Sequence, residues 1–166
     1  MKITAEKQKL ISSLSTAMRA VSLKATLPIL SNICLTAENG KLKVSSTNLE
    51  LGLNYWCVVK VEQEGSLTVP GRVLLEFINS LNSESVTLET KEEMLSITSP
   101  DGDANIAGIV SSEFPSIPSL SPNANIFLDP KEFQKAVSQV AFAASTDTGR
   151  AVLNGILLHF TPESVY

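Results

Sequence analysis

The sequence predicts an α+β fold in which two helices per domain pack on antiparallel sheets. Two segments of the first 83 residues carry apolar side chains at steps of three and four, which is typical of helices with one buried face. Short alternating runs separated by turn residues surround them, which is typical of antiparallel strands. Hydrophobic residues make up 43% of the 166 residues, so the chain can bury a core, and the disordered and low-complexity classes are excluded.

The N-terminal residues predict a short strand at 2–5 and then a helix at 6–21. The apolar stripe of this helix is made by Leu10, Ile11, Leu14, Ala17, Met18 and Val21. Polar residues, among them Lys9 and Arg19, occupy the opposite face, which is therefore expected to be exposed. A loop is expected before Pro28, because proline disfavours helical backbone at the residue that precedes it.

Antiparallel strands and a second helix follow. Strands at 33–37 and 41–45 flank Asn39-Gly40, the dipeptide that a tight primed hairpin turn prefers because both central residues need a positive φ. Further strands are predicted at 49–61, 66–69, 85–90, 94–98 and 104–110. The second helix begins at Pro70, where the missing N–H costs nothing. Its buried stripe consists of Leu74, Phe77, Ile78 and Leu81.

After a linker rich in proline and serine, the pattern of strand, helix, loop and strand starts again. The recurring elements are a strand at 126–128, a helix begun by Asp129-Pro130, and a strand at 153–160. Matching residues of the two modules stand 123 or 124 positions apart, which indicates an internal duplication. We therefore expect a complete first domain at 1–122 and the truncated start of a second, similar domain at 123–166.

Charge is uneven along the chain. The net charge is −4, but residues 1–83 hold nine basic and six acidic residues, whereas 84–166 hold four and eleven. The first 28 residues carry five basic residues against Glu6 alone. A solvated helix face is one explanation. The functional interpretation is a local positive surface for an anionic partner on a body that otherwise repels it.

Few residues suited to catalysis or metal binding are present. His159 is the only histidine, so a histidine-paired metal site cannot be built, and two cysteines provide neither a disulfide framework nor a metal quartet. We expect Cys34 and Cys57 to be buried free thiols of a cytoplasmic protein that has no cofactor and no metal. The enzymatic alternative is a small α+β hydrolase that uses Cys34 or Ser145 with His159. No apolar run is long enough for a membrane span, so no membrane partner is expected.

Six motifs along the chain resemble those of a known family. They are TLPILSNI at 26–33, STNLEL at 46–51, VPGR at 69–72, EFP at 113–115, FAASTD at 142–147 and RAVLNG at 150–155. In order and spacing they resemble the bacterial sliding clamps, the beta subunits of DNA polymerase III. The resemblance implies the DNA-clamp fold with three similar domains per chain. It also implies a head-to-tail ring of two chains that encircles duplex DNA, tethers the replicative polymerase and performs no chemistry.

The resemblance further implies which residues contact DNA. Lys24 and Arg72 take positions that contact DNA in related clamps, and helix phase adds Lys9 and Arg19. A ring that slides needs contact with phosphates without base readout, since base-specific hydrogen bonds would hold it in place. The loop at 146–148 matches another DNA-facing loop, but its acidic residue argues against contact with phosphates.

Protein partners are implied as well. In this family the polymerase and the clamp loader dock short apolar peptides into a pocket between domains, of which this chain retains Arg150 and Leu153. The homodimer ring joins the first domain to the third, and an unpaired edge strand is expected to supply Asn105, Ile106 and Ala107. The alternative that stays open is an α+β interaction module with no nucleic-acid role.

Overall fold

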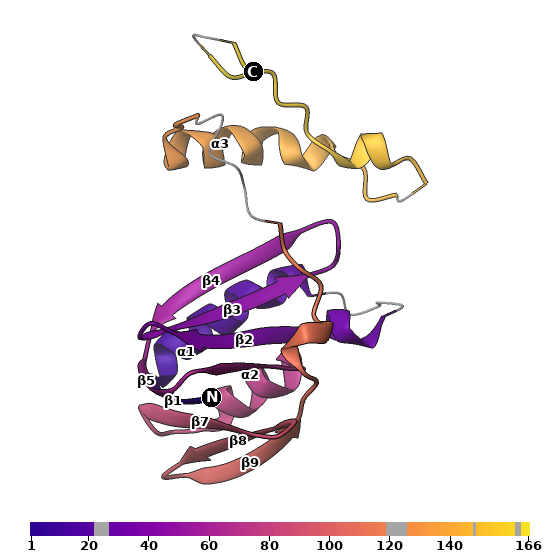
Figure 1. The fold of residues 1–166 in the computed structure, drawn as a ribbon. Helices are drawn as coiled ribbons and strands as arrows, with labels where there is room; N and C mark the ends of the chain where they lie inside the picture. Colours follow the sequence, from indigo (N-terminus) through magenta and orange to yellow (C-terminus); the bar gives the residue numbers. More distant parts are fainter. Residues whose placement is uncertain (22–26, 119–125, 148, 162–163) are drawn as a thin grey trace. The chain divides into compact units, whose positions relative to one another are not determined.

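The computed structural model describes residues 1–21, 27–118, 126–147, 149–161 and 164–166. The chain divides into two compact units, Met1–Pro118 and Ser119–Tyr166, which are described one at a time (Figure 1). Lys24, which is expected to contact DNA, lies outside the described residues. No helix within the described ranges is long and apolar enough to cross a membrane.

The first unit contains two antiparallel sheets. One has the strand order β5-β1-β7-β8-β9 and consists of β1 (Lys2–Glu6), β5 (Lys60–Gln63), β7 (Ser85–Lys91), β8 (Met94–Ser99) and β9 (Gly102–Ala107). The other has the order β4-β3-β2-β6 and consists of β2 (Asn32–Glu38), β3 (Lys41–Thr47), β4 (Gly52–Val58) and β6 (Gly65–Pro70). The two sheets are joined where Thr68 of β6 pairs with Ile109, just after β9.

The hairpin between β2 and β3 confirms the turn prediction. Asn39 and Gly40 have φ angles of 49° and 72°, as a primed turn requires. The single strand predicted at 49–61 is wrong, because β4 and β5 belong to different sheets. Between them the chain crosses from one sheet to the other at Val59, which is buried and whose N–H donates to the Gly40 carbonyl at 3.2 Å. The apolar pattern continues through this crossing, so the break leaves no mark in the sequence.

Two helices pack their apolar stripes into one core that they share with both sheets. They are α1 (Lys7–Ala17), which a short 3₁₀ turn at Met18–Ala20 extends, and α2 (Gly71–Ser80). The side chains of Leu10, Leu14, Leu74 and Ile78 are completely buried, as their spacing predicts. The remaining large side chains that are fully buried come from the strands: Ile3, Ile33, Leu35, Leu42, Leu67, Leu88, Leu95 and Ile97.

Contacts at both ends show that α1 and α2 run antiparallel. At one end the Lys7 ammonium group donates to the carbonyl of Asn79 at 3.4 Å and to that of Leu81, so it satisfies free carbonyls at the C-terminus of α2. At the other end a β-carbon added to Gly71 would lie 2.7 Å from the Met18 sulfur. The end of α1 and the start of α2 are therefore in close contact.

The second unit repeats the helical elements of the first. Helix α3 (Pro130–Val140) begins 123 residues after α1. The 3₁₀ turns at Ala141–Ala143 and Ala151–Asn154 begin 123 residues after those at Met18–Ala20 and Pro28–Ser31, respectively. Asp129 caps α3, since its Oδ1 accepts from two backbone N–H groups at 2.9 and 3.0 Å. The bridge between Phe160 and Val165 corresponds, at the same spacing, to a residue pair of β2 and β3. The same spacing of 123 therefore relates the helical elements and one paired position of the two units, as a duplication would produce.

The strands predicted at 126–128 and 153–160 do not form. In the first unit β1 is paired on both sides, by β5 and β7, and β2 is paired by β3 and β6. Within the described residues of the second unit these neighbours have no counterpart beyond the short pairing near Tyr166. A strand without neighbours leaves its backbone groups unpaired, so an alternating pattern alone does not produce one.

Candidate nucleic-acid interface

The exposed face of the helix pair in the first unit is polar and carries most of the cations that the sequence singles out. On α1 the exposed residues are Gln8, Lys9, Ser12 and Ser15, and on α2 they are Arg72, Val73, Glu76, Asn79 and Ser80. Arg19, in the turn that extends α1, is exposed as well. This set, with Glu6 at the start of α1, is called the helix-pair face below. It lies opposite the buried stripes. Because those stripes pack into the core, the other side of each helix is left in contact with solvent.

Arg19 and Arg72 lie at the same end of the helix pair. Each directly follows one of the two residues that contact each other there, Met18 and Gly71. Arg19 forms no ion pair with any other described residue, so its charge is available to an external anion. The structure therefore places two arginines that are 53 positions apart in the sequence at the same end of the helix pair.

Arg72 is partly engaged by its own helix. Its Nε donates to Glu76 Oε1 at 2.7 Å, one turn further along α2, and both side chains are well exposed. This hydrogen bond and the charge of Glu76 raise the pKa of Arg72. Guanidinium has five N–H donors, and the described residues occupy one of them, which leaves the terminal amino groups free for a planar anion such as phosphate.

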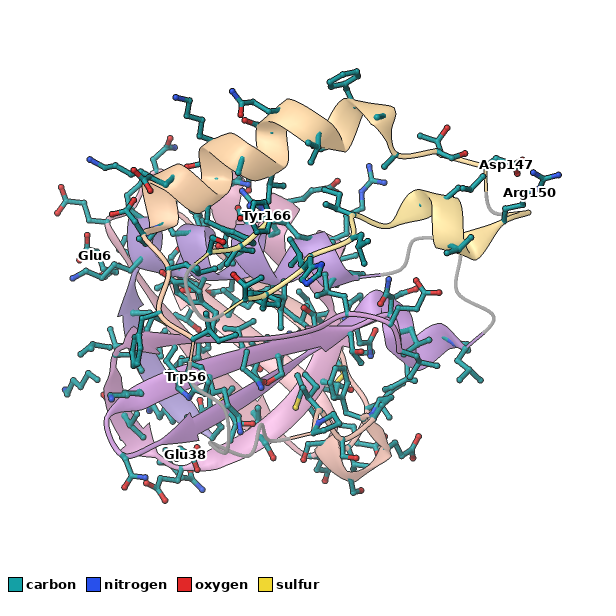
Figure 2. All side chains as sticks on the ribbon, turned by 90° about the horizontal axis from the view of Figure 1, so that it is seen from above. Glu6, Glu38, Trp56, Asp147, Arg150 and Tyr166 are labelled. Carbon is teal, nitrogen blue, oxygen red and sulfur yellow. The ribbon has the colours of Figure 1, made fainter. Side chains whose placement is uncertain are left out.

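Lys9 is held at the other end of α1. Its Nζ lies 2.7 Å from Glu6 Oε2, and Glu6 projects from the beginning of that helix (Figure 2). The hydrogen bond and charge of Glu6 raise the pKa of Lys9. The sequence predicted the exposed position of Lys9 but not this pairing. The available signal was the sequence spacing. Glu6 and Lys9 are three positions apart and Arg72 and Glu76 are four apart, and both spacings allow side chains to meet on a helix.

The loop of the second unit places an acidic side chain next to the segment that is compared with a DNA-facing loop. Asp147 is exposed, and its Oδ1 accepts from the Gly149 N–H at 2.9 Å, so the carboxylate is fixed within the loop. Arg150, at the same loop, is exposed too (Figure 2). Thr148 lies outside the described residues. The acidic side chain keeps this loop a poor candidate for contact with phosphates.

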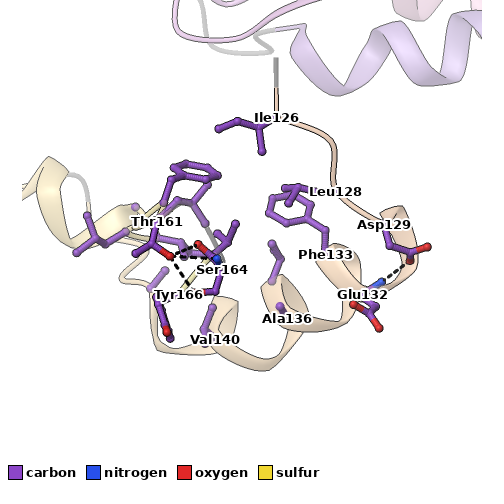
Figure 3. Close-up of a pocket in the computed structure, with 18 of the residues that line it drawn as sticks. Ile126, Leu128, Asp129, Glu132, Phe133, Ala136, Val140, Thr161, Ser164 and Tyr166 are labelled. Atoms are coloured by element: carbon purple, nitrogen blue, oxygen red, sulfur yellow. Dashed lines mark hydrogen bonds between the residues drawn. The ribbon is translucent and has the colours of Figure 1, made fainter. Parts of the chain in front are cut away.

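The second unit contains an apolar pocket of about 1020 Å³ between α3 and residues 152–161 and 164–166 (Figure 3). Leu153 is among its lining residues, whereas Arg150 is not. Its floor includes Phe133, Val137 and Val140, which correspond at a spacing of 123 to the buried stripe of α1. The pocket is therefore the core-facing side of α3 without the strands that cover α1 in the first unit.

Strand β9 is an edge strand, as the sequence predicted. The side chains of Asn105 and Ala107 are exposed, while that of Ile106 is 7% exposed and belongs to the core. Ser96 donates to Asn105 Oδ1 at 2.7 Å across the strand pair. Any partner at this edge would therefore meet the backbone of β9 and the exposed side chains of Asp103, Asn105 and Ala107. Ile106 holds the strand in place from inside.

Within the described part of the second unit, no hydrogen bond joins Ser145 to His159, one of the pairs considered for hydrolysis. Cys34 and Cys57 are buried free thiols, and burial raises the pKa of Cys34, which makes its thiolate less accessible. Cys34 and His159 belong to different units. Ser145 Oγ accepts from the Asp147 N–H, and the ring of His159 packs edge-on against Tyr166 with centroids 6.5 Å apart. The described residues contain no cluster of three side chains that could hold a metal ion.

Comparison with known proteins gives a consistent result. Residues 1–118 match the family model described as DNA polymerase III beta subunit, N-terminal domain. A beta sliding clamp of Rickettsia felis is 32% identical over 160 residues, which are 96% of this chain and 42% of that protein. The chain thus spans less than half the length of the curated relatives it matches.

Solved structures agree in fold. A sliding clamp from Bartonella birtlesii bound to griselimycin superposes with a TM-score of 0.92 at 28% identity, covering 99% of this chain and 45% of that one. A Helicobacter pylori beta clamp bound to a DNA ligase peptide superposes with a TM-score of 0.86 at 25% identity, covering 95% and 44%. Both similarities extend over the two units, so the α+β arrangement of the chain is that of these clamps.

Proposed function

Because this chain belongs to the DNA polymerase III beta subunit family, we propose that it is part of a sliding clamp that encircles duplex DNA and keeps a replicative polymerase on its template. The observation that carries the proposal is the helix-pair face, on which Arg19 and Arg72 stand at the same end of the helix pair among mostly polar side chains. Cations on an exposed helix face can bind phosphates, and phosphate contacts carry no sequence information. Sliding requires that combination.

The clamp acts by topology and makes or breaks no bond, so it needs neither a cofactor nor a metal. In this proposal the ring is a homodimer, and the free edge of β9 with Asn105 and Ala107 contributes to the joint between copies. Lys24 and Lys9 add to the contact with DNA. The polymerase and the clamp loader bind through short apolar peptides, and the protein works in the cytoplasm.

The Helicobacter pylori clamp, which was solved with a DNA ligase peptide bound, supports binding of such peptides. Arg150 and Leu153 would form part of the peptide pocket in this chain. Both side chains are exposed, and Leu153 already lines the apolar pocket of the second unit. The remaining wall would come from further domains, which longer members of the family contain.

The proposal is tested by titrating a labelled duplex of random sequence with the chain and measuring fluorescence anisotropy at about 50 to 200 mM salt. We expect weak binding that is independent of sequence. In the double variant Arg19→Ala/Arg72→Ala, the slope of log affinity against log salt should fall by about 0.9 for each lost phosphate contact.

The matched control is the double variant Lys43→Ala/Lys91→Ala, which removes the same charge from β3 and β7. Both lysines alternate with buried residues of their strands and so lie on the face turned away from the helices. The control should bind DNA as the unmodified chain does. Equal losses in both variants would show that only net charge matters, and salt-independent or sequence-specific binding would refute the proposal. Absence of any DNA binding would favour the interaction module.

A further inference from the structure

We infer that Glu6 and Glu76 limit how strongly the helix-pair face holds DNA, each by occupying one of its cations. The inference rests on the proposed function and deepens it, since it assigns a role in DNA contact to two acidic residues. It concerns a property that a sliding protein needs in addition to attraction, namely a grip weak enough to be released at every step.

The geometry gives each carboxylate one cation. Glu6 Oε2 lies 2.7 Å from Lys9 Nζ, and Glu76 Oε1 lies 2.7 Å from Arg72 Nε. These two glutamates are the acidic residues of the face, and they pair with two of its three described cations. Arg19 is the cation that they leave unpaired. Of the three described cations on the face, only Arg19 can therefore attract a phosphate without competition from a paired carboxylate.

The pair on α2 is poorly explained by helix stability. Arg72 stands in the first turn of α2, where the helix dipole favours an anion, and Glu76 stands in the middle of the helix, where the dipole has little effect. This order is also the less favourable one for a pair four residues apart. An exposed pair of this kind contributes little to folding. A role at the surface accounts better for why the carboxylate is there.

Phosphate and carboxylate compete for the same N–H donors. A phosphate that approaches Arg72 must share the guanidinium group with Glu76 or displace the Glu76 carboxylate. A displaced carboxylate remains nearby and repels the phosphates of the DNA backbone. Because both groups are exposed, the exchange is easy in either direction. The contact therefore forms and breaks readily, while Arg19 supplies a steady attraction at the same end of the helix pair.

The test uses Glu76→Gln and Glu6→Gln in the full chain with the same random-sequence duplex. Glutamine keeps an oxygen that can accept from Arg72 Nε, so positioning is retained while the charge is removed. We expect each variant to bind at least about threefold more tightly at about 50 mM salt, with a salt slope steeper by about 0.9, the equivalent of one more phosphate contact. The combined variant should show both gains.

The control is Glu89→Gln on β7. Glu89 likewise pairs with a lysine, Lys91, and it alternates with the buried Leu88, so it lies on the face away from the helices. This control should bind no more tightly than the unmodified chain. Thermal unfolding of all variants should be unchanged, because the pairs are exposed.

Each result decides between specific alternatives. Tighter binding in Glu76→Gln but not in Glu89→Gln supports the inference. Weaker binding in Glu76→Gln would mean that the carboxylate holds Arg72 in place for DNA, and equal gains in Glu89→Gln would reduce the effect to net charge. Either result overturns the inference while the proposed function stands. If the unmodified chain shows no salt-dependent binding to DNA, the proposed function and the inference both fail.

Discussion

Leu14 and Val137 occupy matching positions in the two units, and their replacement by alanine should have very different costs. Leu14 is completely buried in the core between α1 and the sheets, whereas Val137 lines the open pocket of the second unit and is half-buried. Their positions differ by the spacing of 123 that relates α1 to α3. The pair therefore tests whether the repeated stripe has the same energetic role in both units.

The structure sets the expected magnitudes. Leu14→Ala removes three carbon atoms from a packed site, which costs about 3 to 5 kcal/mol once the remaining cavity is included. With a urea dependence of about 1.5 kcal/mol per molar, the unfolding midpoint should fall by about 2 M or more. Val137→Ala removes two methyl groups that are already near water, and alanine is the better helix former by about 0.5 kcal/mol. The midpoint should therefore change little.

The assay is urea unfolding followed by far-ultraviolet circular dichroism. The result that would refute the reasoning is a similar shift for both variants, since it would mean that the apolar face of α3 is packed in the folded chain. A loss below about 1 kcal/mol for Leu14→Ala would equally contradict the assignment of the first unit's core.

Three further predictions concern local features. Gly108→Ala should destabilise the first unit by more than about 1 kcal/mol in urea unfolding, because the added carbon would lie 2.5 Å from the Thr68 carbonyl oxygen. Gly102→Ala should be neutral, because a carbon added there has no atom within 4 Å. Equal effects of the two substitutions would contradict this prediction. Burial raises the pKa of the Cys34 thiol above its ordinary value, so the folded state keeps the proton longer than the unfolded state. The stability that the protonated thiol contributes is complete below the unfolded pKa and is lost as pH rises through the folded one. Cys34→Ser should therefore lose less stability than the unmodified chain as pH rises past the ordinary thiol pKa. Asp129→Ala should reduce the helical signal of α3, since it removes an N-cap that contributes about 1 kcal/mol; an unchanged spectrum would show that the cap is dispensable.

The sequence predicts the helices of this chain better than its strands, and the reason is where their partners lie. The stripe of α1 and the Asp129-Pro130 start of α3 are local signals, so both helices form as expected. A strand depends on neighbours that are far away in the sequence. The run at 153–160 alternates as β2 does but has no flanking strands among the described residues, and therefore it stays outside any sheet.

The candidate site could be predicted in part. Helix phase places Lys9 and Arg72 on an exposed face, but only the antiparallel packing of α1 and α2 brings Arg19 next to the start of the second helix. The occupation of two cations by Glu6 and Glu76 depends on side-chain geometry. Spacing makes such pairs possible without determining which of them form.

Lys7 and Lys9 stand two positions apart but would respond differently to acetylation. The amine of Lys7 is bound to carbonyls at the end of α2, so blocking it would release that helix end and loosen the first unit. Blocking the amine of Lys9 would merely cancel one charge in contact with solvent. A chemical footprint of lysines on this chain therefore has to be resolved residue by residue, because a summed signal would mix partial unfolding with occupancy of the surface.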